Sequence, residues 1–271
     1  MSEAPPQPFD PPLRFCETRS LRLTYTEEGD AAAPPIVLVH GIPGGATDFR
    51  YLAPLLAARL RVLRFEMPGY GSNRAAALPG PEPAARARAV LEFTDALALD
   101  RFALVGHSMG GRTALEVAGQ RPDRVAALGL LASVGLRRHR GMAPPVFGSI
   151  VRVGGLAPLR PRLVTLAQAA YRKARFPNAE RYTYEDFLLH AQMVTAIDFA
   201  GARAAARAVR CPALVAAADD DHLIERAIAE ELSAALRARL MTFETGGHNI
   251  QKTQARALAT ALCELAQAAL R

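Results

Sequence analysis

The chain has 271 residues, enough for one large α/β domain with a proper hydrophobic core or for two small domains. Half of the residues are apolar and 22% are charged, which is ordinary for a globular protein and excludes a disordered chain. The three cysteines, Cys16, Cys211 and Cys263, form no paired or clustered pattern, so we expect no disulfide framework, no metal and no cofactor.

The charge balance is basic, with 33 Lys and Arg against 26 Asp and Glu and a net charge of +7. Only Lys173 and Lys252 are lysines, and the arginines are scattered along the chain, many of them in Ala-Arg pairs. No basic run is interleaved with aromatic residues and tryptophan is absent, so nucleobases would find few stacking partners. We therefore expect no nucleic-acid partner.

Residues 1–12 contain five prolines and lack the basic and apolar regions of a secretory signal, so we expect a flexible N-terminal lead-in. The longest apolar stretch, residues 125–136, is too short to span a bilayer. Together with the unpaired cysteines, these features favour a cytoplasmic protein without a membrane span.

Eight segments have the patterns of β-strands. In chain order they are residues 13–16, 21–25, 36–39, 61–65, 102–105, 125–131, 213–216 and 240–243. The first two alternate apolar and polar residues and predict half-buried strands at a sheet edge. The third is a continuous β-branched run between prolines and a glycine, which is typical of a strand buried on both faces.

Helical spacing of apolar residues predicts helices between most of these strands. The predicted helices cover residues 48–59, 83–99, 109–120, 226–237 and 251–270. Repeated alternation of strand and helix predicts an α/β fold, a mostly parallel twisted sheet with helices on both faces.

The segment 137–200 interrupts this alternation. It has no convincing buried strand, and its helical patches lie at residues 162–175 and 184–197. Ten basic and four acidic residues give it a charge of +6. We interpret it as an inserted helical cap, or lid, on a core made of residues 13–136 and 201–271. Its charge either selects an anionic ester or thioester or is a solvated outer face.

One motif carries a chemical prediction. Gly106-His107-Ser108-Met109-Gly110-Gly111 follows a predicted strand and opens a predicted helix, the context that a G-x-S-x-G turn requires. Such a turn holds the serine strained, plausibly with a positive φ, so that its hydroxyl projects above the sheet. The flanking glycines let helix and strand approach closely. Ser108 is therefore the candidate nucleophile.

Two backbone N–H groups are candidates for binding an oxyanion. The N–H of Met109 lies at the start of the predicted helix, whose dipole favours negative charge. The loop His40-Gly41-Ile42-Pro43-Gly44-Gly45 follows the third strand, and we expect the N–H of Ile42 to be the second donor. We interpret His40 as a residue that ties this loop together.

A serine nucleophile needs a base, and the base needs an orienting acid. His248 lies in the glycine-flanked turn Gly246-Gly247-His248 between the last strand and the last helix, which lets it reach Ser108. Asp219, Asp220 and Asp221 follow the seventh strand. We choose Asp221 as the acid because it lies farthest beyond the strand end, and Asp220 is the alternative.

Taken in order, these motifs resemble the α/β-hydrolase superfamily, in its branch of lid-bearing serine esterases and lactonases. The resemblance covers residues 14–270 and includes Pro68-Gly69-Tyr70-Gly71-Ser72 and Asp221-His222-Leu223-Ile224. Glu66 departs from the family, which usually has Asp there, and affects a supporting turn.

The resemblance implies hydrolysis of a carboxylic ester, lactone or thioester of a small molecule through an acyl-enzyme on the Ser108-His248-Asp221 triad. A serine at this position excludes the dehalogenases and epoxide hydrolases of the superfamily, which use aspartate. An acyltransferase, a cofactor-free perhydrolase or a C–C bond hydrolase would use the same triad, and a non-catalytic small-molecule receptor would retain the fold. These alternatives stay open.

Overall fold

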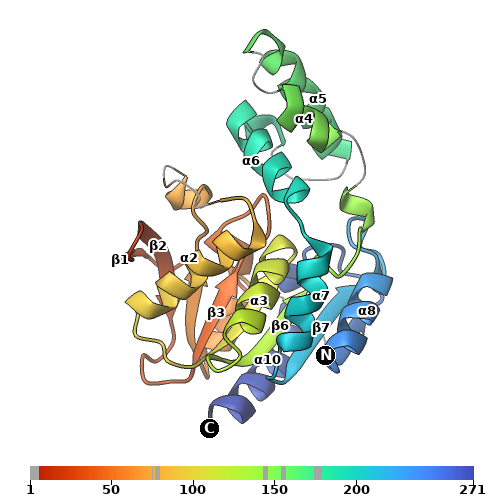
Figure 1. Ribbon diagram of the computed structural model, residues 1–271. Coiled ribbons are helices and arrows are strands. Elements are labelled where there is room, and N and C mark those ends of the chain that lie inside the picture. Colours follow the sequence, from red (N-terminus) through yellow and green to blue (C-terminus); the bar gives the residue numbers. More distant parts are fainter. Residues whose placement is uncertain (1–5, 75, 77–79, 143–145, 154–156, 174–178) are drawn as a thin grey trace.

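The computed structural model describes residues 6–74, 76, 80–142, 146–153, 157–173 and 179–271. Eight strands form one sheet in the order β1-β2-β4-β3-β5-β6-β7-β8 (Figure 1). The strands are β1 (Leu13–Glu17), β2 (Arg22–Glu28), β3 (Pro35–Val39), β4 (Arg61–Phe65), β5 (Phe102–His107), β6 (Val125–Leu131), β7 (Ala213–Ala218) and β8 (Arg239–Phe243). The β1–β2 and β2–β4 pairs are antiparallel, and every other pair is parallel.

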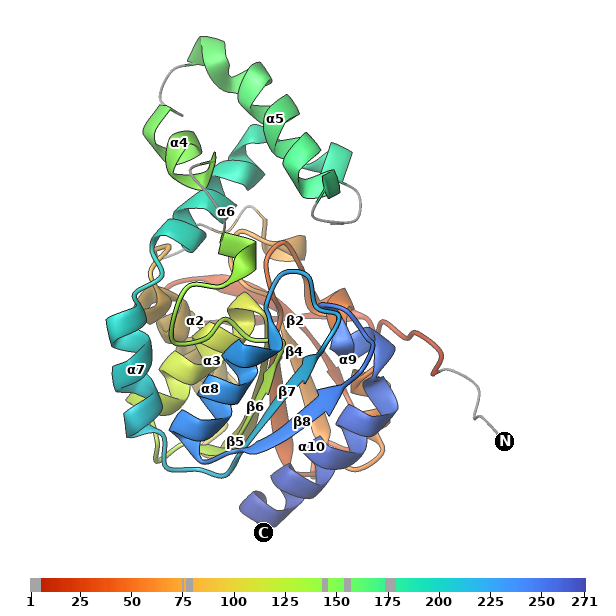
Figure 2. The ribbon, with the colours of Figure 1, turned by 90° about the vertical axis from the view of Figure 1, so that its right-hand side faces the viewer.

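Helices cover both faces of this sheet (Figure 2). One face carries α2 (Pro83–Ala96), α3 (Met109–Gln120), α7 (Phe199–Ala208) and α8 (Arg226–Leu236). The opposite face carries α1 (Ala53–Ala57), α9 (Ile250–Thr253) and α10 (Ala255–Leu270). Side chains of β3 alternate between the two cores: Val37 and Val39 pack on the first face, and Ile36 and Leu38 on the second. This explains the uninterrupted apolar run, because both faces are buried.

The predicted α/β fold is confirmed, and every predicted strand is present with small shifts at its ends. Of the two strands expected to be half-buried at an edge, β1 is the edge strand. In contrast, β2 lies one place inside it, and its residues from Leu23 to Thr26 are all buried. The alternation of apolar and polar residues in β2 predicted one solvent-exposed face, but Thr24 and Thr26, the polar residues of this stretch, are buried against protein.

Helix boundaries differ more than strand boundaries. The helix predicted over 48–59 is divided into a 3₁₀ turn, η1 (Ala46–Phe49), and the short helix α1, which begins at Ala53 and has Pro54 in its first turn. The helix predicted over 251–270 is divided between α9 and α10. Helix α7 was not predicted, and it crosses the expected boundary at residue 200. Its buried face consists of the small residues Ala202, Ala205 and Ala206 rather than of large apolar side chains.

Helices α4 (Val146–Val153), α5 (Arg160–Lys173) and α6 (Tyr184–Thr195) stand together beyond the carboxyl ends of the parallel strands (Figures 1 and 2). They share a small apolar cluster of their own, which includes Ile150, Ala167 and Phe187. The end of the helix predicted over 162–175 lies outside the described residues, as do residues 1–5 of the predicted lead-in.

Aromatic rings join these helices to the sheet domain. His190 of α6 is stacked between Tyr171 of α5 and Tyr70, which belongs to the loop after β4. The ring Nδ1 of His190 is 2.9 Å from the hydroxyl of Tyr171. Within the described ranges, every helix falls short of the length and apolarity needed to cross a bilayer.

Candidate active site

Ser108 occupies the turn between β5 and α3. Its backbone has φ 55° and ψ −119°, the positive φ expected for a strained nucleophile turn. The turn is anchored by a hydrogen bond from the Ser108 N–H to the Leu131 carbonyl at 2.9 Å. A Cβ added to Gly106 would overlap the carbonyl of Gly110, and one added to Gly110 would overlap that of Val39. The glycines therefore allow α3 to lie directly against the strands that carry Ser108.

His248 reaches Ser108 from the loop between β8 and α9. Its Nε2 is 2.9 Å from the Ser108 Oγ, and its Nδ1 is 2.8 Å from Oδ2 of Asp221. Gly246 and Gly247, with φ of 151° and 62°, provide the positive-φ turn that brings the ring back over the sheet. All three side chains are buried, and Asp221 is the least exposed of them.

The three consecutive aspartates have three different partners. Asp219 pairs with Arg226 on the surface, Asp220 accepts a hydrogen bond from the Gly247 N–H at 2.7 Å, and Asp221 bonds His248. The other oxygen of Asp221 accepts from the N–H groups of Leu223 and Ile224 at 2.8 and 3.1 Å.

These contacts favour the charged form of Asp221. Burial by itself would raise the pKa of Asp221, but the hydrogen bond and charge of His248 and the two N–H donors outweigh burial and hold that pKa below its ordinary value. The geometry thus gives Asp221 the contact with the imidazole, and it gives Asp220 the role of bracing the histidine loop.

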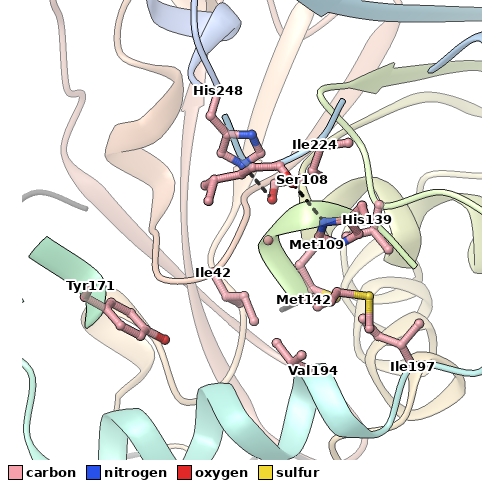
Figure 3. A pocket seen from close by; sticks show the side chains of 13 residues that line it. Ile42, Ser108, Met109, His139, Met142, Tyr171, Val194, Ile197, Ile224 and His248 are labelled. Carbon is pink, nitrogen blue, oxygen red and sulfur yellow. Dashed lines mark hydrogen bonds between the residues drawn. The ribbon is translucent and has the colours of Figure 1, made fainter. Parts of the chain in front are cut away.

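The proposed oxyanion donors lie in the same place as the serine. Ile42 and Met109 line one cavity together with Ser108 and His248 (Figure 3). Met109 is the first residue of α3, where an N–H has no acceptor within the helix. The helix N-terminus also carries partial positive charge, which favours an anion at this point.

His40 and Glu66 hold the loop that carries Ile42. The Nδ1–H of His40 donates to the Gly41 carbonyl at 2.7 Å, and its Nε2 accepts from the Met67 N–H at 3.0 Å. The Glu66 carboxylate accepts from the Ala46 N–H at 3.1 Å and also bonds the turn after β4. His40 therefore holds its loop in place as expected and also ties it to the turn after β4, and the Glu66 carboxylate bridges the same two segments.

His107 is fully buried beside His248. Its Nε2 donates to the His248 carbonyl at 2.9 Å, which fixes the backbone of the candidate base. Burial, and then the neighbouring His248, lower the pKa of His107 to about 3. It is therefore neutral at physiological pH and holds the loop in place.

The cavity above Ser108 is open to solvent, and together with the solvent at its mouth it contains about 530 Å³ of space that no protein atom fills. Its walls are mostly apolar. Tyr171 of α5, Val194 of α6 and Ile197 from the connection between α6 and α7 contribute to them (Figure 3). Ser108, His248, His139 and Tyr171 are the polar side chains among its lining residues. None of the described arginines and lysines of segment 137–200 lines the cavity, and Arg175 lies outside the described residues.

Sequence reasoning did not identify His139, Met142, Tyr171, Val194 and Ile197 as lining residues. No local pattern marks them, because they meet Ser108 only through the packing of segments that are distant in the sequence. In the part of the chain that the structure describes, no group of three or more His, Cys, Asp or Glu side chains could hold a metal ion.

Comparisons with known proteins identify the family to which the fold belongs. The model of a family described as the alpha/beta hydrolase fold matches residues 34–255. RutD of Klebsiella pneumoniae (strain 342), a proposed carbamate hydrolase, is 30% identical over 261 residues, which cover 90% of this chain and 95% of that protein. The dihydrolipoyllysine-residue acetyltransferase component of the acetoin cleaving system of Pseudomonas putida is 41% identical over 114 residues. That match covers 42% of this chain and 30% of that protein.

A solved structure is similar over nearly the whole chain. The enol-lactonase from Burkholderia xenovorans LB400 superposes with a TM-score of 0.74, covering 94% of this chain and 100% of that chain at 21% identity. At this identity the likeness concerns the fold.

Proposed function

This chain belongs to the alpha/beta hydrolase fold family, and from that membership we propose that it is a serine hydrolase acting on a carboxylic ester, lactone or thioester of a small molecule. The observation that carries the proposal is the continuous hydrogen-bonded chain from the Ser108 Oγ through His248 to Asp221. A buried hydroxyl with an imidazole at 2.9 Å and a carboxylate behind it is the arrangement that activates serine for attack on a carbonyl.

In the first step, Ser108 Oγ attacks the carbonyl carbon while its proton passes to Nε2 of His248. The carbonyl oxygen becomes an oxyanion, which the N–H groups of Ile42 and Met109 bind. Asp221 holds the ring in the tautomer that leaves Nε2 free to accept, and its charge stabilises the imidazolium. The imidazolium then gives its proton to the leaving oxygen or sulfur as the bond to the carbonyl carbon breaks, which leaves an acyl-enzyme on Ser108.

In the second step, water attacks the acyl-enzyme. His248 takes a proton from the water and returns it to Ser108 Oγ as the ester bond to the serine breaks, and the free acid departs. An alcohol, thiol or peroxide that reached the acyl-enzyme instead would give acyl transfer or perhydrolysis with the same residues.

The walls of the cavity support a neutral acyl group. Burying a charge without a partner is costly, and no charged side chain stands among the lining residues that the structure describes. We propose that residues 137–200 act as a cap that shapes this cavity and that their basic residues form its outer face. Arg137, for example, is exposed and pairs with Glu225 and Glu231.

A panel of fluorogenic and p-nitrophenyl esters of increasing acyl length tests the proposal, with the Ser108→Ala variant as control. We expect hydrolysis by the wild type and a loss of about 10⁴-fold or more in the variant. A carbamate ester belongs in the panel because of the similarity to RutD over most of both chains. Product analysis with methanol, thiol and peroxide as competing acceptors separates hydrolysis from transfer. Equal rates of ester hydrolysis by the wild type and by Ser108→Ala would overturn the triad assignment.

A further inference from the structure

Helix α5 presents a basic stripe to solvent. Arg162, Leu166, Ala169 and Lys173 are spaced four, three and four residues apart, so they follow one another along a single face of the helix. All four are exposed, and Leu166 is the most exposed large apolar side chain among the described residues, at 65%. A leucine therefore projects into solvent with a cation near each end of the same face.

The opposite face of α5 is turned towards the protein. Ala167 and Tyr171 lie on that face and are buried, and Tyr171 lines the cavity that holds Ser108. Figures 1 and 2 both show α5 in the outermost part of the group of helices that stands beyond the sheet. The outward stripe is therefore displayed at one extremity of the molecule, with the cavity on the other side of the same helix.

No negative charge in this region balances the stripe. Residues 146–173, which span α4 and α5, contain four arginines, one lysine and no Asp or Glu. The five cations are Arg152, Arg160, Arg162, Arg172 and Lys173. In the part of the chain that the structure describes, no carboxylate lies within ion-pair distance of them, whereas Arg226 on the sheet domain has two acidic neighbours. The region keeps an uncompensated positive field, which attracts an anionic surface.

An exposed leucine between cations fits an anionic lipid surface better than it fits other partners. Lipid headgroups attract Arg and Lys, and the boundary between headgroups and acyl chains accepts an apolar side chain. A second copy of the same stripe would bring cations against cations. A nucleic acid would attract the cations, but the stripe carries no aromatic ring for a base to stack on, and phosphates offer Leu166 no apolar surface.

We propose that the outward stripe of α5 docks the protein on the surface of an anionic lipid bilayer. Leu166 enters the headgroup boundary, while Arg162 and Lys173 stay at the level of the lipid phosphates. The helix lies along the surface, since its 14 residues are too few to cross a bilayer. The inference goes beyond the proposed hydrolase function and can fail separately from it, because lipid binding is measured without turnover.

Sedimentation of the full chain with lipid vesicles tests the proposal. Vesicles of phosphatidylcholine are compared with vesicles that also contain about 30% phosphatidylglycerol, an anionic lipid. We expect the partition coefficient to be about tenfold or more higher for the anionic vesicles at ~50 mM NaCl, and to fall by about fivefold or more at ~500 mM NaCl because salt screens the cations. Equal partition onto both kinds of vesicle, or no binding to either, would overturn the proposal.

Two matched double variants locate the docking surface. Arg162→Glu with Lys173→Glu reverses two charges of the stripe and should reduce binding to the anionic vesicles by about tenfold. Arg88→Glu with Arg207→Glu makes the same change of net charge at exposed positions of α2 and α7, so its loss should stay below about threefold. Losses of equal size would place the binding elsewhere and overturn the assignment to α5.

Leu166→Gln separates lipid from other anionic partners, because it removes the apolar side chain and keeps the charge. We expect it to lower partition onto anionic vesicles by about threefold to tenfold, and Leu13→Gln, an exposed leucine on β1, to change it by less than about twofold. Thermal melting checks that each variant is folded, and the wild-type lipid and salt comparison needs no variant.

Two further outcomes would overturn the lipid assignment. Binding of the wild type to duplex DNA as tightly as to anionic vesicles, with no effect of Leu166→Gln on either, would indicate a general polyanion surface. A dimer in light scattering that Leu166→Gln dissociates would indicate that a second copy covers the stripe.

Discussion

Replacing Asp221 with asparagine tests how the imidazole is held. The asparagine Oδ1 can keep the two bonds from Leu223 and Ile224, so the turn after β7 should fold as before. Its amide group, however, would donate to Nδ1 of His248, where the carboxylate now accepts at 2.8 Å. That exchange places the ring hydrogen on Nε2, the atom that must accept the Ser108 proton.

The expected cost is large because two contributions are lost at once. The ring takes the wrong tautomer, and the imidazolium loses its counter-charge, for which a fall of about 10³- to 10⁴-fold in kcat is the usual scale. Steady-state hydrolysis of the best ester in the panel measures this loss of kcat, and we expect KM to change little.

The neighbouring aspartates are matched controls. Asp220→Asn keeps an acceptor for Gly247, and Asp219→Asn removes only an exposed ion pair, so both should stay within about threefold. Activity of Asp221→Asn within tenfold of the wild type, or an equal loss in Asp220→Asn, would refute the assignment.

Three further substitutions test the supporting structure. Gly110→Ala forces a Cβ against the Val39 carbonyl and should cost about 1–3 kcal/mol in thermal unfolding, whereas Gly148→Ala, with open space around it, should cost almost nothing. Burial lowers the pKa of His190 to about 4, so stability is complete above pH 6.5 and falls as the pH drops towards 4. His107 contributes a similar loss in both proteins, so the fall in stability between pH 7 and 4.5 should be smaller in His190→Asn than in the wild type, by about 3 kcal/mol at most. Glu66→Gln leaves one of the N–H groups that the carboxylate now satisfies without an acceptor, and urea unfolding should show a loss of about 1–3 kcal/mol. An unchanged midpoint would contradict the bracing role.

The core of the fold follows from sequence because its signals are local. Val37 and Val39 face one core and Ile36 and Leu38 the other, so the run has to be apolar throughout and is visible without any tertiary information. Catalytic candidates are visible for the same reason. Ser108 lies in a glycine-rich turn at a strand end, and such turns have compact sequence patterns.

What the sequence could not supply depends on contacts between distant segments. The partners of Asp220 and Asp221 are decided by how the turn after β7 meets the loop of His248, and residues one position apart have the same local pattern. The cavity wall formed by Val194 and Ile197 depends on how α6 is placed over the sheet. The hydrogen bond between His139 and the Leu223 carbonyl joins segments that are far apart in the sequence, so no local pattern predicts it.

A fluorophosphonate probe with intact-mass and peptide analysis tests the central claim most directly, since it reports on the reactivity of one hydroxyl without a guess at the substrate. We expect one probe per chain attached to Ser108, no labelling of Ser108→Ala, and labelling slowed by orders of magnitude in His248→Ala. Wild-type protein that stays unmodified, or that is modified at another residue, would contradict the account.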